Sequence, residues 1–536
     1  MKLKISHILV PLLSLLIISS FYYFQLNNLL YNASIDFVEG YVVYNGLKLV
    51  IQGENIYSDP TYIVPYPPFG YILSAIGSII FPTCMICGCR FIVFIFSILL
   101  AYLIFLEAGN KKRYAVLAPA IFYLTPILSF WSSLCRVDIQ AIFFSILAAA
   151  LYLRGRENLS AIAASIALQF KQTAISIILA ITIYAYFKSG VRNSLKILGK
   201  LVLAAAIPYL ALAVIVGPRS LLDIFYYGAA HTLSETNPLN IYLSSITGIS
   251  AVFYLISLYM ASKRFRDDLY PLYYIISTIL GLITSAKVGA NTNYFLEPLA
   301  VGSIMFVRTL SKLKMKWIYP IIAILLSYGL AANAFATPIY ASDSSAVIGT
   351  VCAAKIISNS TKPVVMDDAY VAVLAGKTLL VEPFIHKQLV LRGIFEDFIT
   401  RDLMRFRYDY VVLRWSCELR FFNSFCSYLR SNYTLIYDFG QKVYSAGINA
   451  TQTCEKMPRL EDLRLNTFRY STYISRFLQI FGFIFMFMCV VIYVVGERIE
   501  DSHNNSCQER DSNDKHPNSS IIKARSNHHR IFRKSL

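Results

Sequence analysis

Long apolar runs dominate this sequence. Between residues 5 and 333 they recur as stretches of about 15–20 residues separated by short polar segments, which is the length that a helix needs to cross the hydrocarbon core of a membrane. Backbone polar groups in lipid must bond within their own segment, so we interpret these runs as helices. The chain is 56% apolar, above the roughly 45–50% of soluble domains. We therefore expect a polytopic α-helical membrane protein.

The first apolar run, Ile5–Phe24, follows two lysines as a signal peptide does. It is long, it lacks a small-x-small cleavage site, and many further runs follow it, so we interpret it as a retained first helix. A weaker apolar piece, Phe69–Phe81, is expected to lie on the outer surface as a juxtamembrane helix. With a last span near the C-terminus, the total is about 12 transmembrane helices. The other predicted spans are Phe91–Glu107, Tyr114–Trp131, Ile139–Leu153, Leu159–Phe170, Ala174–Phe187, Leu201–Val216, Leu239–Ala261, Leu269–Ser285, Phe295–Leu310, Trp317–Asn333 and Tyr473–Val495.

The formal net charge of +18 raises the question of a nucleic-acid partner. Most basic residues, however, lie in short loops between the predicted spans, and every dense basic loop falls on one side of the membrane. This is the positive-inside bias, which orients the protein. We therefore expect a multi-pass cell-membrane protein and no nucleic-acid partner.

Residues 335–470 have shorter apolar runs, in which strand-like and helix-like pieces alternate. This alternation predicts a small α/β domain, which span parity places outside the membrane. The predicted strands are Lys362–Met366, Thr378–Val381, Tyr410–Leu413 and Tyr433–Tyr437, and the predicted helices are Val347–Ile357, Ile394–Phe406 and Phe422–Leu429.

The chain is thereby divided into four parts. Residues 1–334 form a transmembrane catalytic module and residues 335–470 the extracytoplasmic α/β domain. Residues 471–496 form a final transmembrane helix, and residues 497–536 a polar, disordered cytoplasmic tail. The tail contains four of the seven histidines, which we interpret as solvated residues and not as a metal site.

Cysteine spacing gives no metal framework. Cys84, Cys87 and Cys89 are clustered, but no second ligand pair completes a tetrahedral site, so we interpret them as small apolar residues near a membrane surface. Cys417 and Cys426 lie in the predicted outer domain, where a disulfide is possible. No metal site is predicted.

Two acids stand in the first outer loop, Asp36 and Glu39. Their i, i+3 spacing puts both carboxylates on one helical face. Such a pair can deprotonate an acceptor hydroxyl or hold a cation beside a phosphate. The alternative is a pair of surface acids at a helix start.

Four basic residues are candidates for binding a phosphate: Arg90, Arg136, Lys171 and Lys287. Cations in a poorly solvated site stabilise the negative charge that a departing phosphate develops. Lys171 is the strongest candidate because it stands between two apolar helices, where an unpaired ammonium group has a high free-energy cost. Snorkelling to the interface is the alternative for Lys171, and a structural ion pair with Asp138 is the alternative for Arg136.

Further polar and aromatic residues are predicted near the outer ends of the spans. Tyrosines there can stack on sugars, although an aromatic belt at the membrane interface explains them equally well. The candidate substrate-binding residues are Tyr57, Tyr66, Asp138, Gln172, Asn293, Tyr294 and Glu297.

Several common nucleotide and hydrolase signatures are missing from the sequence. It contains no P-loop, no dinucleotide fingerprint, no nucleophile elbow and no histidine-rich zinc motif. No acidic motif for a nucleotide-sugar donor appears on an inside loop. These absences favour a donor attached to a lipid carrier.

The order of these motifs resembles the GT-C glycosyltransferases, which include protein O-mannosyltransferases, lipid A aminoarabinose transferases and archaeal and bacterial relatives. An acidic pair is followed by Gly53-Glu54-Asn55-Ile56-Tyr57 and then by Tyr66-Pro67-Pro68. The later motifs that resemble an archaeal and bacterial branch are Cys135-Arg136-Val137-Asp138, Phe170-Lys171-Gln172-Thr173, Asn293 to Glu297, Met366-Asp367-Asp368, Ala375-Gly376-Lys377 and Glu382-Pro383-Phe384. The resemblance covers roughly residues 1–445.

The resemblance implies a membrane glycosyltransferase that moves a sugar, with inversion, from a polyprenyl- or dolichyl-phosphate carrier on the extracytoplasmic face. By analogy Asp36 is the base and Glu39 supports it, while Arg90, Arg136 and Lys171 face the carrier phosphate. The acids form Asp-x-x-Glu and not the adjacent Asp-Glu of the O-mannosyltransferases. The acceptor therefore stays open among glycan, lipid and protein, and so does the choice of which of the two acids is the base. Some relatives use a divalent cation and others do not, so the cofactor also stays open.

Two other classes of function are retained as alternatives. A lipid-linked substrate transporter or flippase also has many helices and buried charges, but here the charges cluster at one face and no inverted repeat is visible. An inactive protein of the same fold is the third class.

Overall fold

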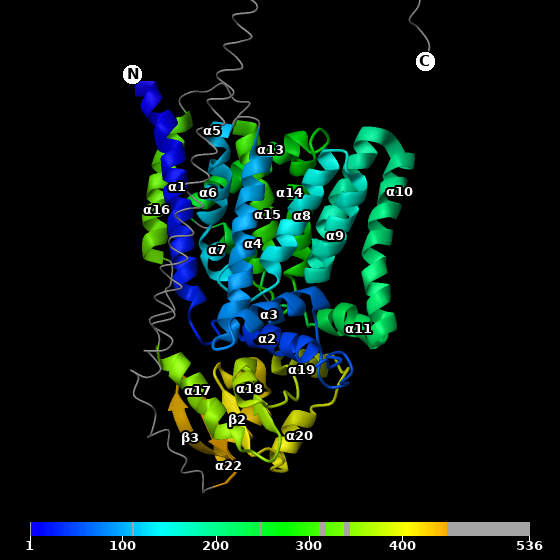
Figure 1. Ribbon diagram of the computed structural model, residues 1–536, viewed down its shortest axis with the longest axis vertical. Coiled ribbons are helices and arrows are strands. Elements are labelled where there is room, and N and C mark those ends of the chain that lie inside the picture. The colour runs from blue at the N-terminus through cyan, green and yellow to red at the C-terminus, as the bar shows by residue number, and fades with distance from the viewer. Residues whose placement is uncertain are drawn as a thin grey trace, which may run out of the picture. The chain divides into compact units, whose positions relative to one another are not determined.

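The structure, a computed structural model, describes residues 2–109, 112–234, 236–246, 248–310, 318–336 and 344–447. The predicted span Tyr473–Val495, the predicted tail and the basic cluster Lys312–Lys316 lie outside the described residues. The described part is a helical module followed by a small sheet domain (Figure 1).

The helical module contains α-helices joined by short 3-10 and π-helical turns. In chain order its elements are α1 (Lys2–Leu29), α2 (Phe37–Val50), α3 (Pro68–Ile80), α4 (Met85–Ala108), α5 (Lys112–Ala115), α6 (Leu117–Tyr123), α7 (Pro126–Trp131), α8 (Asp138–Leu153), α9 (Glu157–Phe170), η1 (Gln172–Ala174), α10 (Ile175–Val216), α11 (Arg219–Leu221), η2 (Leu222–Tyr226), η3 (Tyr227–Ala229), α12 (Pro238–Ser245), α13 (Ile249–Arg264), α14 (Leu269–Thr284), η4 (Thr292–Phe295), α15 (Leu296–Leu310) and α16 (Ile318–Ala336).

Three described helical stretches are long and apolar enough to cross a membrane. Two further helices reach that length only if they are counted as one span with a sharp bend between them. The three are Ile8–Leu29, Met85–Ala108 and Gln172–Val216, and the pair is Pro238–Ser245 with Ser250–Arg264. Other predicted spans form helices of only 14–16 residues, namely α8, α9, α14 and α15. The count of about 12 spans therefore stays a prediction.

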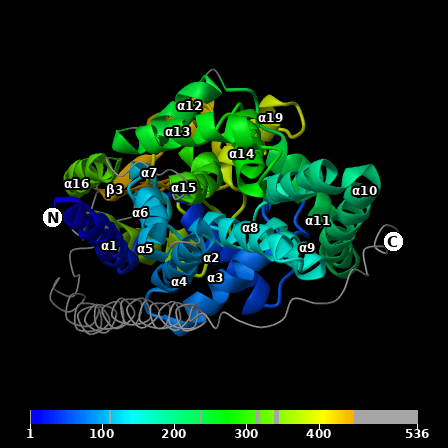
Figure 2. The ribbon, with the colours of Figure 1, turned by 90° about the horizontal axis from the view of Figure 1, so that it is seen from above.

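Helix α10 is two helices joined at Gly190, whose φ of 76° is the left-handed conformation that glycine tolerates best. This break separates the predicted spans Ala174–Phe187 and Leu201–Val216. Seen along the helices, α10 lies at one side of the module, and α1 with α16 lies at the opposite side (Figure 2). The prediction of two spans here agrees with the observed hairpin.

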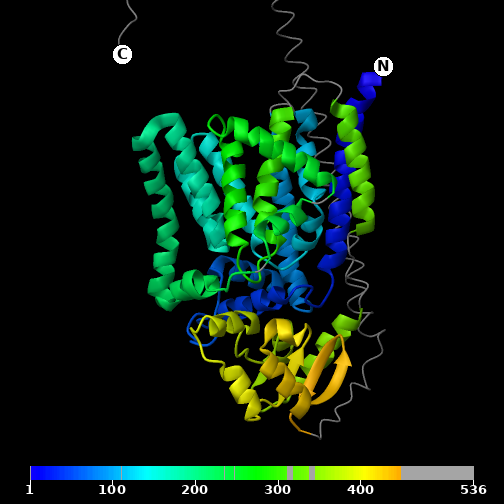
Figure 3. The same ribbon diagram turned by 180° about the vertical axis from the view of Figure 1, so that it is seen from behind.

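Helices α2 and α3 lie across the ends of the longer helices, between them and the sheet domain (Figures 1 and 3). Helix α3 covers most of the predicted juxtamembrane segment Phe69–Phe81 and starts with Pro68 in its first turn, where a missing N–H does no harm. Helix α2 lies very close to α18 (Ala369–Ala375). A Cβ added at Gly40 would lie only 2.5 Å from the backbone nitrogen of Tyr370. One apolar core is shared between α2, α3 and the sheet domain.

The sheet domain has four strands in the order β1-β2-β4-β3. β1 and β2 are parallel, with Val364 opposite Tyr410, and β4 pairs antiparallel with both β2 and β3. The elements are α17 (Ser344–Ser358), β1 (Val364–Met366), α18 (Ala369–Ala375), α19 (Pro383–Leu391), α20 (Phe398–Met404), β2 (Tyr410–Leu413), α21 (Cys417–Arg420), α22 (Asn423–Asn432), β3 (Thr434–Phe439) and β4 (Gln441–Ser445).

Three of the four predicted strands form, but Thr378–Val381 does not. In that segment the N–H of Leu379 donates to the hydroxyl of Tyr44, 3.0 Å away on α2, so the segment packs on the helical module instead of pairing in the sheet. Strand β4 was not predicted. It follows a tight turn at Gly440, whose φ is 69°.

Three disulfides are present in the described residues: Cys84–Cys87, Cys89–Cys135 and Cys417–Cys426. The third was considered possible from the sequence and is confirmed. The interpretation of the first cysteine cluster as small apolar residues is wrong, because folding brings Cys135 beside the start of α4. The Cys89–Cys135 bond ties α4 to the turn that precedes α8.

Candidate active site

Asp36 is the N-cap of α2. Its Oδ1 accepts from the N–H of Val38 at 3.0 Å and from Nη1 of Arg136 at 2.8 Å. The side chain is 12% exposed, the N–H of Glu39 also donates to it in a capping box, and no described side chain donates to its Oδ2. Asp36 is therefore oriented by the helix start that it caps and by Arg136.

Arg136 links Asp36 to a second carboxylate. Its Nε lies 3.3 Å from Oδ2 of Asp138, and its guanidinium lies 4.9 Å from the ring centroid of Trp131. Arg136 stands in the turn fixed by the Cys89–Cys135 disulfide. The planar guanidinium can bind both acids in defined directions.

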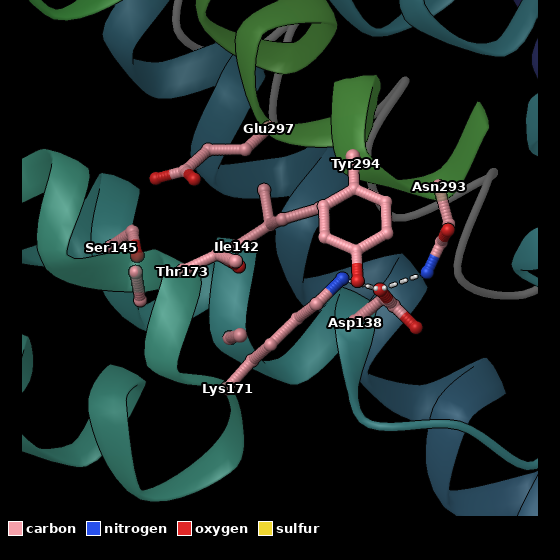
Figure 4. Close-up of a pocket in the computed structure, with 10 residues that line it drawn as sticks. Asp138, Ile142, Ser145, Lys171, Thr173, Asn293, Tyr294 and Glu297 are labelled. Carbon is pink, nitrogen blue, oxygen red and sulfur yellow. Dashed lines mark hydrogen bonds and ion pairs between the residues drawn. The ribbon is translucent and has the colours of Figure 1, made fainter. Parts of the chain in front are cut away.

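Asp138, the first residue of α8, is the central anion of the site. Its Oδ1 accepts from Nζ of Lys171 at 2.5 Å and from Nδ2 of Asn293 at 3.0 Å. Figure 4 shows Lys171 and Asn293 pointing toward Asp138 from separate segments. Acid, guanidinium, acid and ammonium thus alternate from Asp36 to Lys171.

Lys171 lies where α9 ends, with an extended backbone at φ −151° and ψ 128°. Its Nζ is 4.6 Å from the ring centroid of Tyr294, and Nζ of Lys287 is 5.8 Å from the same ring. Lys287 forms no ion pair with any described residue. The two ammonium groups therefore share one aromatic neighbour, but only Lys171 has an acid partner.

A pocket opens beside these residues. Its lining includes five of the residues predicted from the sequence, together with Ser145 and Thr173, which were not predicted (Figure 4). The five are Asp138, Lys171, Asn293, Tyr294 and Glu297. At the other end of the pocket, Oε1 of Glu297 accepts from the hydroxyls of Ser176 and Tyr273, each at 2.5 Å.

Glu39 and Arg90 lie away from this pocket and bind each other. The Glu39 side chain has no exposure and accepts from Nε and Nη2 of Arg90, both at 2.7 Å. Arg90 also donates to the carbonyls of Asn28, Tyr31 and Ala33. Every donor direction of Arg90 is occupied, so this arrangement gives it no place on a carrier phosphate and makes both residues supports of the first loop.

Two more predicted substrate residues have structural partners. The Tyr57 hydroxyl donates to the carbonyl of Tyr66 at 2.8 Å, and Nε2 of Gln172 donates to the carbonyls of Pro65 and Ile224. These contacts hold the loop before α3 in place. Tyr66 is close enough to Arg136 and Lys171 for their charges to act on its hydroxyl. Of the three, only Tyr66 borders the charged cluster.

Arg420, on α21 of the sheet domain, also reaches this region and was missed. Its guanidinium carbon lies 3.5 Å from the ring centroid of Phe37, next to Asp36. No sequence signal links residues so far apart in the chain. Only packing of the sheet domain on α2 brings them together.

The ionisation of Asp36 is shifted by these surroundings. Burial raises the pKa of the Asp36 carboxyl above its usual value, and the charge of Glu39 adds to the rise. Arg136, the Val38 N–H and Arg420 oppose it. The described residues contain no group of three or more His, Cys, Asp or Glu side chains arranged to hold a metal ion.

Similarity to solved structures is clear, although no protein-family model and no curated protein sequence matches the chain. ArnT from Cupriavidus metallidurans, bound to undecaprenyl phosphate, superposes with a TM-score of 0.59 at 10% identity, covering 81% of this chain and 98% of ArnT. The chain has the ArnT fold. ArnT in the apo state gives a TM-score of 0.58 at 11% identity over the same shares of the two chains.

A second solved structure with this fold is the oligosaccharyltransferase of Archaeoglobus fulgidus in its apo form. Its TM-score is 0.50 at 14% identity, covering 76% of this chain and 69% of that one. The resemblance to GT-C glycosyltransferases read from the motifs is therefore confirmed for the fold. ArnT, which this chain covers almost completely, is the more informative of the two.

Proposed function

We propose that this protein is a membrane glycosyltransferase that moves a sugar from a polyprenyl-phosphate carrier to an acceptor hydroxyl. The observation on which this depends is the alternating charge chain Asp36–Arg136–Asp138–Lys171 at the edge of a pocket. ArnT, which has the same fold, was solved with undecaprenyl phosphate. This row of charges has a carboxylate, that of Asp36, at one end and an ammonium group, that of Lys171, at the other.

Asp36 acts as the base in this proposal. Its Oδ2, which accepts from no described side chain, takes the proton of the acceptor hydroxyl as the acceptor oxygen bonds to the anomeric carbon. A carboxyl whose pKa is raised by burial is a stronger proton acceptor than an ordinary aspartate. Arg136 keeps Asp36 oriented during the transfer.

Lys171, Lys287 and Arg136 bind the carrier phosphate. The acceptor oxygen attacks the face of the anomeric carbon opposite the phosphate, and the bond from that carbon to the phosphate oxygen breaks, its electron pair leaving with the carrier phosphate. The configuration of the sugar therefore inverts. Negative charge grows on that oxygen, and cations held in a site with little water stabilise it. Lys287 has no fixed anion among the described residues, so it is available to the phosphate.

The remaining candidates have supporting roles. Asp138 orients Lys171 and Arg136, while Asn293, Tyr294 and Glu297 face the sugar or its phosphate from the pocket wall. Glu39 and Arg90 position the loop that contains Asp36. The sugar is attached to a lipid, so it enters from the membrane; the acceptor is a glycan, a lipid or a protein.

The site faces the extracytoplasmic side in this proposal, and the protein crosses the membrane many times. Cys89–Cys135 lies beside the site, and Cys417–Cys426 lies in the sheet domain. Disulfides persist in oxidising compartments, which supports that side. Residues 335–470 form the extracytoplasmic domain and residues 471–496 the last span, with the tail in the cytoplasm. Protection of the sheet domain from protease in sealed right-side-out vesicles would contradict this orientation.

The decisive experiment compares Asp36→Asn with the wild-type protein in reconstituted vesicles, using labelled polyprenyl-phosphate sugars. Loss of a general base lowers the transfer rate by roughly 10²–10⁴-fold. The matched control is Glu54→Gln, an exposed acid of the same loop that pairs with Lys48. Equal transfer by Asp36→Asn and wild type refutes the assignment. Carrier movement without any sugar transfer supports the transporter alternative instead.

A further inference from the structure

Aromatic and charged side chains meet where the sheet domain touches the start of α2. The guanidinium carbon of Arg420 lies 3.5 Å from the ring centroid of Phe37 and 5.5 Å from that of Trp415. The ring centroids of Phe37 and Phe384 are 6.3 Å apart. All three rings are partly exposed. We call Phe37, Phe384, Trp415, Arg420 and Glu382 the aromatic patch.

Arg420 has no acid partner in this patch. The residue is 7% exposed, yet it forms no hydrogen bond or ion pair with any described residue, and its Nε is buried. Buried charges in proteins are almost always paired or hydrogen-bonded. The stacking on Phe37 stabilises the cation but leaves its N–H groups unused.

Glu382, the N-cap of α19, presents the opposite polarity. Its Oε2 accepts from the N–H of Ile385, whereas its buried Oε1 accepts from no described residue. The buried hydroxyl of Tyr41 also lacks a partner, and the charges of Glu382 and Arg420 both act on it. A donor, an acceptor and a hydroxyl without partners thus lie in one small region, and buried polar groups left without partners call for an explanation such as a bound ligand.

The patch adjoins the proposed base. Phe37 follows Asp36 in the chain, and Arg420 and Glu382 are both close enough to act on the charge of Asp36. A molecule bound to the patch therefore lies beside the first turn of α2, which Asp36 caps. The pocket with Lys171 is lined by α8, the α9–α10 break and α15, so it belongs to a different wall.

The charges around the patch favour a neutral, hydroxyl-bearing ligand. Three carboxyl groups, those of Asp36, Asp367 and Glu382, lie within electrostatic reach of Arg420. An anionic ligand there meets these three carboxyl groups as well as Arg420. A hydroxyl, by contrast, can both donate to a carboxylate such as that of Glu382 and accept from a guanidinium such as that of Arg420, and partly exposed rings suit the apolar faces of sugars.

We propose that Arg420 and Glu382 bind the acceptor beside Asp36, and that the unit they bind is a carbohydrate. The proposal rests on the proposed function, because it treats Asp36 as the base. It gives the sheet domain a direct part in acceptor selection. The acceptor class becomes a glycan, or a glycan attached to a lipid, rather than a peptide.

The experiment measures binding separately from transfer. The full-length protein in nanodiscs is titrated calorimetrically with oligosaccharides of glucose, mannose, galactose and N-acetylglucosamine units, and with a peptide that contains Ser, Thr and Asn. At least one oligosaccharide binds, and Glu382→Gln and Arg420→Lys each weaken it about tenfold, the effect of losing a hydrogen bond to a charged group. Glu418→Gln, an exposed acid of the same domain, leaves binding unchanged.

The Asp36→Asn variant separates the two proposals. It retains oligosaccharide binding if the patch is the acceptor site, whether or not it transfers sugar. Thermal unfolding of each variant shows whether the sheet domain is intact, and Arg420→Lys keeps the charge should a larger change unfold it. Binding of the peptide alone, absence of any oligosaccharide binding, or equal binding by wild type, Glu382→Gln and Arg420→Lys overturns the inference.

Discussion

The ammonium group of Lys171 lies 2.5 Å from the carboxylate of Asp138, although Asp138 begins α8 and Lys171 follows the end of α9. Both side chains are about nine-tenths buried or more. Asp138 holds Arg136 as well, so one carboxylate sets the position of two cations. This relationship makes Asp138 the residue on which the charge arrangement of the site most depends.

Substituting Asp138 with Asn leaves two buried cations with one fewer anion. Breaking a buried ion pair costs about 3–5 kcal/mol, so we expect a lower unfolding temperature and a loss of sugar transfer of about 100-fold or more. Thermal unfolding and transfer assays in nanodiscs measure both effects. The control is Glu157→Gln, which removes a half-exposed pair with Lys200 and is expected to change little. Normal activity of Asp138→Asn would show that the cations need no such anchor.

Substituting Lys287 with Met tests the free cation. Because Lys287 pairs with no described acid, its removal is expected to leave stability unchanged and to raise KM for the carrier-linked donor by about tenfold, the loss of one charge-assisted contact. KM for the acceptor should not change. Lys263→Met is the matched control, since Lys263 also lies 5.8 Å from a tyrosine ring but on exposed surface. A change in acceptor KM alone would remove Lys287 from the phosphate site.

The Glu39–Arg90 pair is expected to act on folding and not on chemistry. Glu39→Gln leaves Arg90 buried without a counter-charge, which costs about 3–5 kcal/mol. The double variant Glu39→Gln with Arg90→Gln removes both charges and should recover part of the lost stability. Denaturation measured by tryptophan fluorescence gives these values. If Glu39→Gln stays fully stable but loses transfer, then Glu39 takes part in the reaction.

The disulfide Cys89–Cys135 is expected to stabilise the turn that contains Arg136. It closes a loop with a sequence separation of 46, for which the chain-entropy model gives about 4 kcal/mol. Cys417–Cys426, with a separation of 9, gives about 2.5 kcal/mol. Replacing both cysteines of each pair with Ser should therefore lower the unfolding temperature more for the first pair, and lower transfer only for the first. Equal transfer by both variants contradicts the proposed link to Arg136.

Transfer is expected to depend on pH through Asp36. The base must be ionised, and burial raises its pKa above the ordinary value of 3.8. The rate therefore rises as pH increases through the raised pKa, and falls as pH decreases below it. Arg136→Gln removes a charge that lowers this pKa, so the same rise should move to higher pH. A profile of kcat/KM against pH measures both, and an unchanged midpoint in Arg136→Gln would contradict the assignment.

The sequence alone predicted much of the helical module, because apolar runs of helical length and basic loops are local properties. The sequence predicted the helix at Phe69–Phe81 and the strands around Val364 and Tyr410. It also predicted the candidate set of acids and cations. The conformation of Thr378–Val381 could not be predicted, since a strand forms only if a neighbour pairs with it, and here the neighbour was Tyr44 of α2.

The amino-acid sequence determined which charges stand beside long apolar runs, and such runs favour helices. Only the tertiary structure decided which charge meets which. It placed Asp36 against Arg136, closed Glu39 onto Arg90, joined Cys89 to Cys135, and brought Arg420 onto the ring of Phe37, a residue remote from it in the chain. Pairing of this kind depends on distances in space between segments remote in the chain, and those distances are set by packing.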